Sequence, residues 1–171
     1  MRFLQYILTA IDTLNRWVAR TVSWAVVVIM TATLYEVVMR YVFNAPTKWV
    51  FEFNYLLHGP YFLLLGAYTF AVNGHVNVDI VYSKLPLRVR AAVDIITMPI
   101  LLYFLFVMLL SGIQFSANSF SFRETLSSAW APPVYPVKMV IPAAALLFIL
   151  QAAAKLIRDI HALITGKSGV L

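Results

Sequence analysis

The sequence contains no cysteine, and only 12% of its 171 residues are charged. Without cysteine the chain can form no disulfide, no catalytic thiolate and no thiolate metal site. A soluble domain would carry about 25% charged residues, so the composition argues against a soluble protein. The sequence also lacks a nucleophile–base pair, a P-loop, a dinucleotide-binding glycine pattern and a zinc motif. We therefore do not expect an enzyme, and we expect no cofactor.

Long apolar runs fill most of the chain instead. Hydrophobic residues make up 62% of it, and four segments are long enough to cross a bilayer: 22–43, 49–72, 89–115 and 134–157. About 20 residues of helix span a hydrocarbon core of about 30 Å. Because backbone groups in lipid must be paired internally, these segments should be helices. We predict an all-α membrane protein with four transmembrane helices, in a single domain covering residues 1–171.

The first 20 residues have a different pattern. Apolar residues recur at helical spacing (Leu4, Ile7, Leu8 and Ile11 among them), and polar residues fall largely on the other side. This spacing predicts an amphipathic helix over residues 1–20 that lies on the membrane surface before the first crossing. The alternative is that the segment simply extends the first transmembrane helix inward.

The basic residues predict the orientation of the chain. Nine Lys and Arg residues lie in the N-terminal segment, the connection between the second and third spans, and the C-terminal tail. Only Lys48, Arg123 and Lys138 lie on the other side, with Arg40 inside the first span. The positive-inside rule then places both termini in the cytoplasm. Because these bases gather at helix ends, the net charge of +6 indicates topology and phospholipid contact rather than nucleic-acid binding.

The first two predicted spans each contain one acidic residue. Glu36 and Arg40 are four residues apart in the first span, with the acid first, which favours an ion pair within the helix. Alternatively, Glu36 carries a proton or substrate, or Arg40 contacts lipid headgroups. Glu52 lies near the start of the second span, where it suits the helix dipole and could meet Lys48 or a partner subunit. His58 has no second histidine at similar depth, which argues against a haem site.

Two connections are rich in polar residues. Residues 73–79, at the end of the second span, could bind a metal or form a hydrogen-bonded turn. The connection 116–136 faces outward and combines serines with charged and aromatic side chains. It is suited to the membrane interface or to a docking partner. The candidates for docking are Lys48, Arg123, Glu124 and Trp130.

Two motifs resemble those of a known family. Residues 40–46 (Arg-Tyr-Val-Phe-Asn-Ala-Pro), followed by Trp49 and Glu52, resemble a hallmark of the small membrane subunit (Q-type, DctQ-like) of tripartite ATP-independent periplasmic (TRAP) transporters. Residues 74–79 (Gly-His-Val-Asn-Val-Asp) are similar to a second hallmark. One departure is that phenylalanines flank Glu52, where the family often has paired acids. The candidate residues at the partner interface are Glu36, Arg40, Asn44, Pro46, Trp49, Glu52, Gly74, His75 and Asp79.

The resemblance implies a function and partners. Such subunits reside in the bacterial inner membrane and pair with a large multi-spanning (M-type) subunit, which carries sodium and substrate by an elevator-type movement. A periplasmic (P-type) binding protein delivers the substrate, usually an organic acid. The small subunit is expected to brace the scaffold of the large one and to help dock the binding protein. Residues 54–60 and 127–133 further resemble a subgroup for 2-oxo monocarboxylates.

Two other functions compete with this one. Small proton-coupled multidrug exporters also have four spans and an acid in the first helix, and such a homodimer would work through Glu36. These exporters are shorter, however, lack a surface helix and keep their acid unpaired. A structural or assembly protein of another complex is the third possibility.

Overall fold

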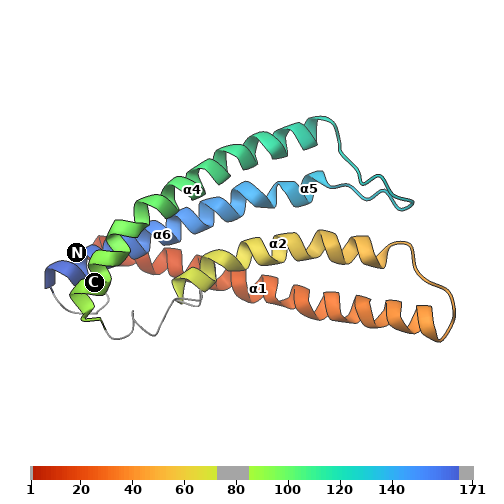
Figure 1. Ribbon diagram of the computed structural model, residues 1–171, viewed down its shortest axis with the longest axis horizontal. Coiled ribbons are helices and arrows are strands. Elements are labelled where there is room, and N and C mark those ends of the chain that lie inside the picture. The colour runs from red at the N-terminus through yellow and green to blue at the C-terminus, as the bar shows by residue number, and fades with distance from the viewer. Residues whose placement is uncertain (1, 73–84, 166–171) are drawn as a thin grey trace.

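The computed structural model describes residues 2–72 and 85–165, and helices make up most of them. The helices are α1 (Arg2–Tyr41), α2 (Val50–Ala71), α4 (Leu87–Ser121), the four-residue α5 (Tyr135–Lys138) and α6 (Val140–Thr165). Figure 1 shows the long helices running lengthwise, with the start of α1 and the end of α6 at the same end. We call this the terminal end. The opposite end carries the connections 42–49 and 122–134, and we call it the loop end.

Three helices are long and apolar enough to cross a membrane: Gln5–Tyr41, Leu87–Ser121 and Tyr135–Thr165. They correspond to three of the four predicted spans. α2 nearly coincides with the predicted span 49–72 but is not one of these three helices, and it carries the polar residues Glu52, Asn54 and His58 in its first half. Its 22 residues still give a length of about 33 Å. Length and composition therefore support three predicted spans, and the fourth stays a prediction.

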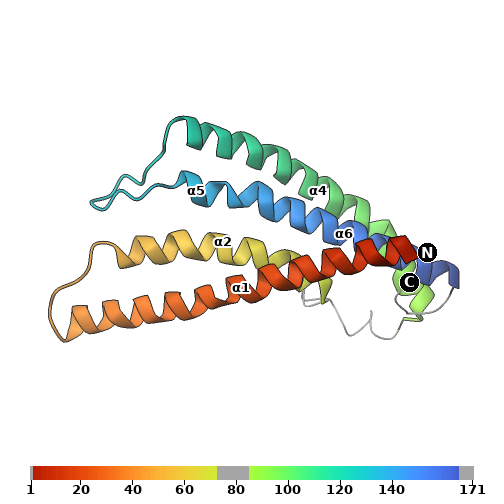
Figure 2. The ribbon, with the colours of Figure 1, turned by 180° about the vertical axis from the view of Figure 1, so that it is seen from behind.

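The first helix differs from the prediction. A surface helix over 1–20 and a span over 22–43 were expected as separate elements, but α1 is one unbroken helix of 40 residues. The physical reason is that residues 2–41 contain neither glycine nor proline, so nothing breaks the backbone hydrogen-bond ladder. The first half of α1 lies beside α6 in Figure 2, and Asp12 binds Gln151 and Arg158 of α6 there. The two segments are therefore one continuous helix and not two separate elements, and the position of residues 1–20 relative to the membrane surface stays a prediction.

Two other helix boundaries also differ from the predicted spans. α4 continues to Ser121, six residues past the predicted end of the third span, so the connection to the last helix is shorter than expected. The predicted fourth span is divided into two helices, because α5 ends at Lys138 and α6 begins at Val140. Pro142 therefore lies in the first turn of α6, where a missing N–H costs nothing. Pro60 and Pro99 are true interior prolines.

The long helices pack in a row, with α6 in a central place. α4 packs on α6, α6 on α2, and α2 on α1, while α1 also touches α6. Figures 1 and 2 show the helices close together at the terminal end and spread apart at the loop end. The row therefore resembles a fan that is narrow at the terminal end.

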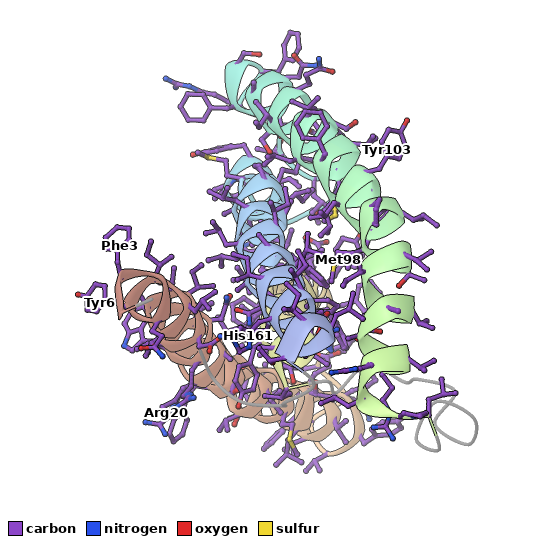
Figure 3. The ribbon with its side chains drawn as sticks, turned by 90° about the vertical axis from the view of Figure 1, so that its left-hand side faces the viewer. Phe3, Tyr6, Arg20, Met98, Tyr103 and His161 are labelled. Atoms are coloured by element: carbon purple, nitrogen blue, oxygen red, sulfur yellow. The ribbon has the colours of Figure 1, made fainter. Side chains whose placement is uncertain are left out.

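The buried core lies between α4, α6 and α2. It centres on Met98, Leu105 and Ala152, which are at most 3% exposed. Figure 3 shows Met98 pointing from α4 toward α6, while Tyr103 points away. Small residues bring the helices close: a Cβ on Gly112 would lie 3.0 Å from the side chain of Ile141, and α6 buries four alanines. Close approach through small residues is how membrane helices gain packing energy.

Candidate functional site

Glu36 is the centre of a polar clamp at the loop end. Its Oε1 accepts hydrogen bonds from Nη2 of Arg40 at 2.6 Å and from Nε at 3.1 Å. Its Oε2 accepts one from the backbone N–H of Thr47 at 3.0 Å and one from the Thr47 hydroxyl. The carboxylate thus joins the last turn of α1 to the segment that enters α2. The i, i+4 spacing predicted Arg40 as a partner of Glu36, but no local pattern indicated Thr47.

Asn44 turns the chain so that Thr47 can reach this clamp. Its φ of 51° is left-handed, a conformation that asparagine tolerates better than most residues. The N–H of Ala45 then donates to the carbonyl of Met39 at 3.0 Å, which closes the end of α1. Pro46 follows in the connection and cannot extend a helix back toward α1. The sequence candidates Glu36, Arg40, Asn44 and Pro46 therefore act on one turn.

Trp49 joins the two connections of the loop end. Its ring centroid lies 6.2 Å from that of Tyr35, 5.9 Å from Phe53 and 6.3 Å from Trp130. The contacts to Phe53 and Trp130 are edge-to-face, an orientation that aromatic quadrupoles favour. Trp49 thus contacts α1, α2 and the connection 122–134. Trp49 and Trp130 were predicted for different roles, and the structure brings them together.

Trp49 and Phe53 also line an apolar groove between α1 and α2. The groove has a volume of about 520 Å³ and is open along one side. Its lining is almost entirely apolar, with Thr31 as the polar exception. The lining residues are Val27, Val28, Thr31, Ala32, Tyr35, Trp49 and Phe53.

Glu52 binds the connection 122–134 rather than Lys48. Its Oε2 accepts a hydrogen bond of 2.8 Å from the hydroxyl of Ser128. That hydroxyl oxygen in turn accepts the N–H of Ala131, whose φ of 47° is left-handed. A carboxylate on α2 therefore orders a tight turn in the connection. The serine-rich composition of the connection indicated hydroxyl groups there, but it did not identify Ser128 as the partner of Glu52.

Glu124 and Lys138 form the third polar link of the loop end. Nζ of Lys138 donates to Oε2 of Glu124 at 2.5 Å and lies 4.0 Å from the ring centroid of Phe115. The hydroxyl of Ser116 donates to the Lys138 carbonyl at 2.7 Å. The hydrogen bond from Lys138 lowers the pKa of Glu124 below its ordinary value. The predicted docking residues Lys48 and Arg123 are both exposed at this end.

A family model matches residues 29–162, under the description "Tripartite ATP-independent periplasmic transporters, DctQ component". The chain belongs to the DctQ family. The match runs from inside α1 to inside α6 and so includes every loop-end residue described above. A comparison with curated proteins found no match.

The DctQ family consists of transporter components, not enzymes, and its members belong to three-part TRAP transporters. Membership therefore implies a large membrane subunit and a periplasmic binding protein as partners. It gives no support to the multidrug exporter. The geometry also disfavours that role for Glu36, because both carboxylate oxygens already accept hydrogen bonds from the chain.

A second polar network lies at the terminal end of this DctQ component and was not predicted from the sequence. Asp12 accepts from Arg158 at 2.6 Å and from Gln151 at 2.9 Å, and Asn15 donates to Gln151 at 2.7 Å. Gln151 and Asn15 are 0% and 2% exposed. Nearby, Lys155 pairs with Asp94 and, at 2.7 Å, with Asp159. A glutamine, a lysine and an arginine spaced four and three residues apart on α6 were the available signal.

The candidates Gly74, His75 and Asp79 lie outside the described residues. The second motif of the resemblance, over residues 74–79, therefore remains a prediction, as do the metal site and the turn that were considered for residues 73–79.

Proposed function

We propose that this chain is the small accessory membrane subunit of a sodium-driven TRAP transporter for organic acids. In this role it braces the scaffold of the large transport subunit and helps to dock the periplasmic binding protein. The observation that carries the proposal is the cross-linked loop end. Glu36, Glu52 and Glu124 each bind a neighbouring segment through a hydrogen bond or ion pair, and Trp49 joins both connections.

The cross-linked loop end suits docking rather than transport. A substrate site in a carrier needs polar groups free to bind an ion or a carboxylate. Here the acidic groups are already used to hold the connections in place. The charged side chains that remain accessible at the loop end include Lys48 and Arg123, which are both exposed. Two exposed cationic side chains suit electrostatic steering of a partner protein with an acidic rim. Sodium and the carboxylate belong to the partner subunits.

The exposed sides of the fan support the bracing role. Large apolar side chains on α1 and α4, including Trp24, Met30, Ile96 and Ile100, are 66–74% exposed. Such surfaces need lipid or another membrane protein against them. We place α2 in the bilayer as the fourth span, because it packs along both α1 and α6. Both termini are then cytoplasmic in a bacterial inner membrane, with the loop end in the periplasm. A phospholipid acyl chain fits the groove between α1 and α2.

Purification tests this proposal. A tagged copy is isolated from its native membrane in mild detergent, and the copurifying proteins are identified and quantified by mass spectrometry. We expect one large multi-spanning protein at a one-to-one ratio. A homodimer with no partner would overturn the proposal and return attention to Glu36 as a proton carrier.

A further inference from the structure

One side of the first half of α2 is exposed. This side carries aromatic residues and a glycine, which are residue types that suit close helix packing. Phe51, Tyr55 and Phe62 are 81%, 68% and 67% exposed, and His58 is exposed as well. A Cβ on Gly59 would have no atom within 4 Å. At 100° per residue these five positions fall within an arc of about 100°. We call Phe51, Tyr55, His58, Gly59 and Phe62 the α2 stripe.

The same side of α2 is covered further along the helix. Gly66 follows Gly59 by seven residues and therefore lies on nearly the same side. A Cβ on Gly66 would lie 3.2 Å from the ring of Phe148 on α6, so here the two helices are in close contact. Toward the loop end the helices spread apart (Figure 1), and Gly59 meets no neighbour. The α2 stripe thus continues a packed face beyond the point where this chain supplies the packing.

His58 shows what chemistry the missing neighbour needs. Its Nδ1 lies 2.9 Å from the carbonyl oxygen of Asn54. Because a carbonyl only accepts, Nδ1 carries the hydrogen in this contact, and in the tautomer with one ring hydrogen Nε2 is then an acceptor. The ring stacks on Phe62, with centroids 6.1 Å apart. In the part of the chain that the structure describes, no group donates to Nε2. An acceptor without a donor is costly at membrane depth, and lipid tails carry no donor.

We propose that the α2 stripe seats a transmembrane helix of the large transport subunit, which crosses α2 at Gly59 and donates a hydrogen bond to Nε2 of His58. The identity of this partner rests on the proposed function. Gly59 admits the backbone of the incoming helix, as small residues do at membrane helix crossings. Phe51, Tyr55 and Phe62 supply apolar area on either side of that crossing. His58 fixes the depth at which the two helices meet.

Photo-crosslinking tests where the partner lies. A benzophenone side chain replaces Tyr55 or Phe62 in the tagged chain within its native membrane, and Tyr103 serves as the reference. Tyr103 is also an aromatic residue, is 72% exposed and points away from the bundle in Figure 3. We expect adducts with the large subunit in several-fold higher yield from Tyr55 and Phe62 than from Tyr103. Adducts with a second copy of this chain, or only with lipid, would overturn the inference.

The same samples separate this inference from the proposed function. If the large subunit copurifies but Tyr55 and Phe62 crosslink no better than Tyr103, the inference fails and the proposed function stands. If no large subunit copurifies, the proposed function fails and the inference fails with it.

Two substitution pairs test the contacts. Gly59→Leu has room within this chain, so the isolated subunit should fold normally, but the large subunit should be lost from the purified complex, whereas Gly59→Ala should retain it. His58→Leu should weaken the complex by about three- to tenfold, the effect of one interhelical hydrogen bond in a membrane. His58→Gln, which keeps an acceptor, should restore most of the binding. Unchanged binding by both Gly59→Leu and His58→Leu would refute the proposed contact.

Discussion

The side-chain amide of Asn15 donates a hydrogen bond of 2.7 Å to the amide oxygen of Gln151, 136 residues away in the chain. Both side chains are almost fully buried, and Asp12 and Arg158 extend the link on one side. The first half of α1 is therefore fastened to α6 by a hydrogen-bonded network. This link makes the amphipathic start of the chain part of the bundle.

Breaking this link should destabilise the isolated subunit. Asn15→Leu leaves the buried amide oxygen of Gln151 without its donor, and we expect a loss of about 1–2 kcal/mol in the free energy of unfolding. Thermal unfolding in detergent measures it. The double variant Asn15→Leu with Gln151→Leu should lose less than the sum of the two single variants, because the two amides then disappear together. Strict additivity would show that the hydrogen bond contributes nothing.

Removing the acid that orders the connection 122–134 should impair the assembled transporter. Glu52→Ala removes the acceptor of the Ser128 hydroxyl, so the connection loses its attachment to α2. We expect reduced substrate uptake by the complex in reconstituted vesicles, with the helix content of the subunit unchanged. Ser128→Ala should cause a similar reduction, and combining the two should add little. Uptake at the wild-type rate in both single variants would contradict a role for this contact.

The clamp on α1 should matter more than an exposed charge beside it. Arg40→Ala removes the ion pair with Glu36, which helps to hold the carboxylate against Thr47. We expect weaker retention of the large subunit during purification and slower uptake. Lys48→Ala serves as the control for loss of one positive charge at the same end, and it should leave subunit retention unchanged. Equal behaviour of the two variants would mean that net charge, and not the clamp, is what matters.

The order of the connection 122–134 should depend on pH. Lys138 holds the pKa of Glu124 below its ordinary value of 4.5. The folded state therefore favours the deprotonated carboxylate more than the unfolded chain does. The stabilisation is therefore fully present above the unfolded pKa and is lost as the pH falls through the lower, folded pKa. Limited proteolysis of the connection should be unchanged from pH 7 to pH 5 and should accelerate below about pH 4.5. In Glu124→Gln, cleavage attributable to this pair should not vary with pH.

Two glycines should respond oppositely to the same substitution. Gly112→Leu would drive a side chain into Ile141 and into the backbone of Pro142, at a cost of about 1–3 kcal/mol for overpacking. Gly59→Leu meets open space and replaces a poor helix former by a good one. Melting of the isolated subunit in detergent should therefore fall for the first variant and hold or rise for the second. Equal melting temperatures would show that the crossing of α4 and α6 at Gly112 is not tight.

The sequence predicted the helices better than their contacts. Apolar runs located the helices because a bilayer imposes both length and composition on a span. Residues 1–20 were predicted to be separate from the first span because they have a polar side. A polar side is equally expected of a surface helix and of a helix that contacts Gln151 and Arg158. Only the positions of those partners on α6 decide between the two. The clamp on Glu36 was foreseen at Arg40, four residues away, but Thr47 depends on the turn at Asn44.

The unbroken course of α1 has a mechanical consequence. With neither glycine nor proline between residues 2 and 41, this helix is a stiff rod about 60 Å long. A tilt of about 5° at one end displaces the other by about 5 Å, and no hinge absorbs the motion. The rod is fastened to α6 at one end through Asp12 and Arg158, and to the connection 42–49 at the other end through Glu36 and Thr47. A helix held in this way at both ends resists shear between the terminal end and the loop end of the bundle.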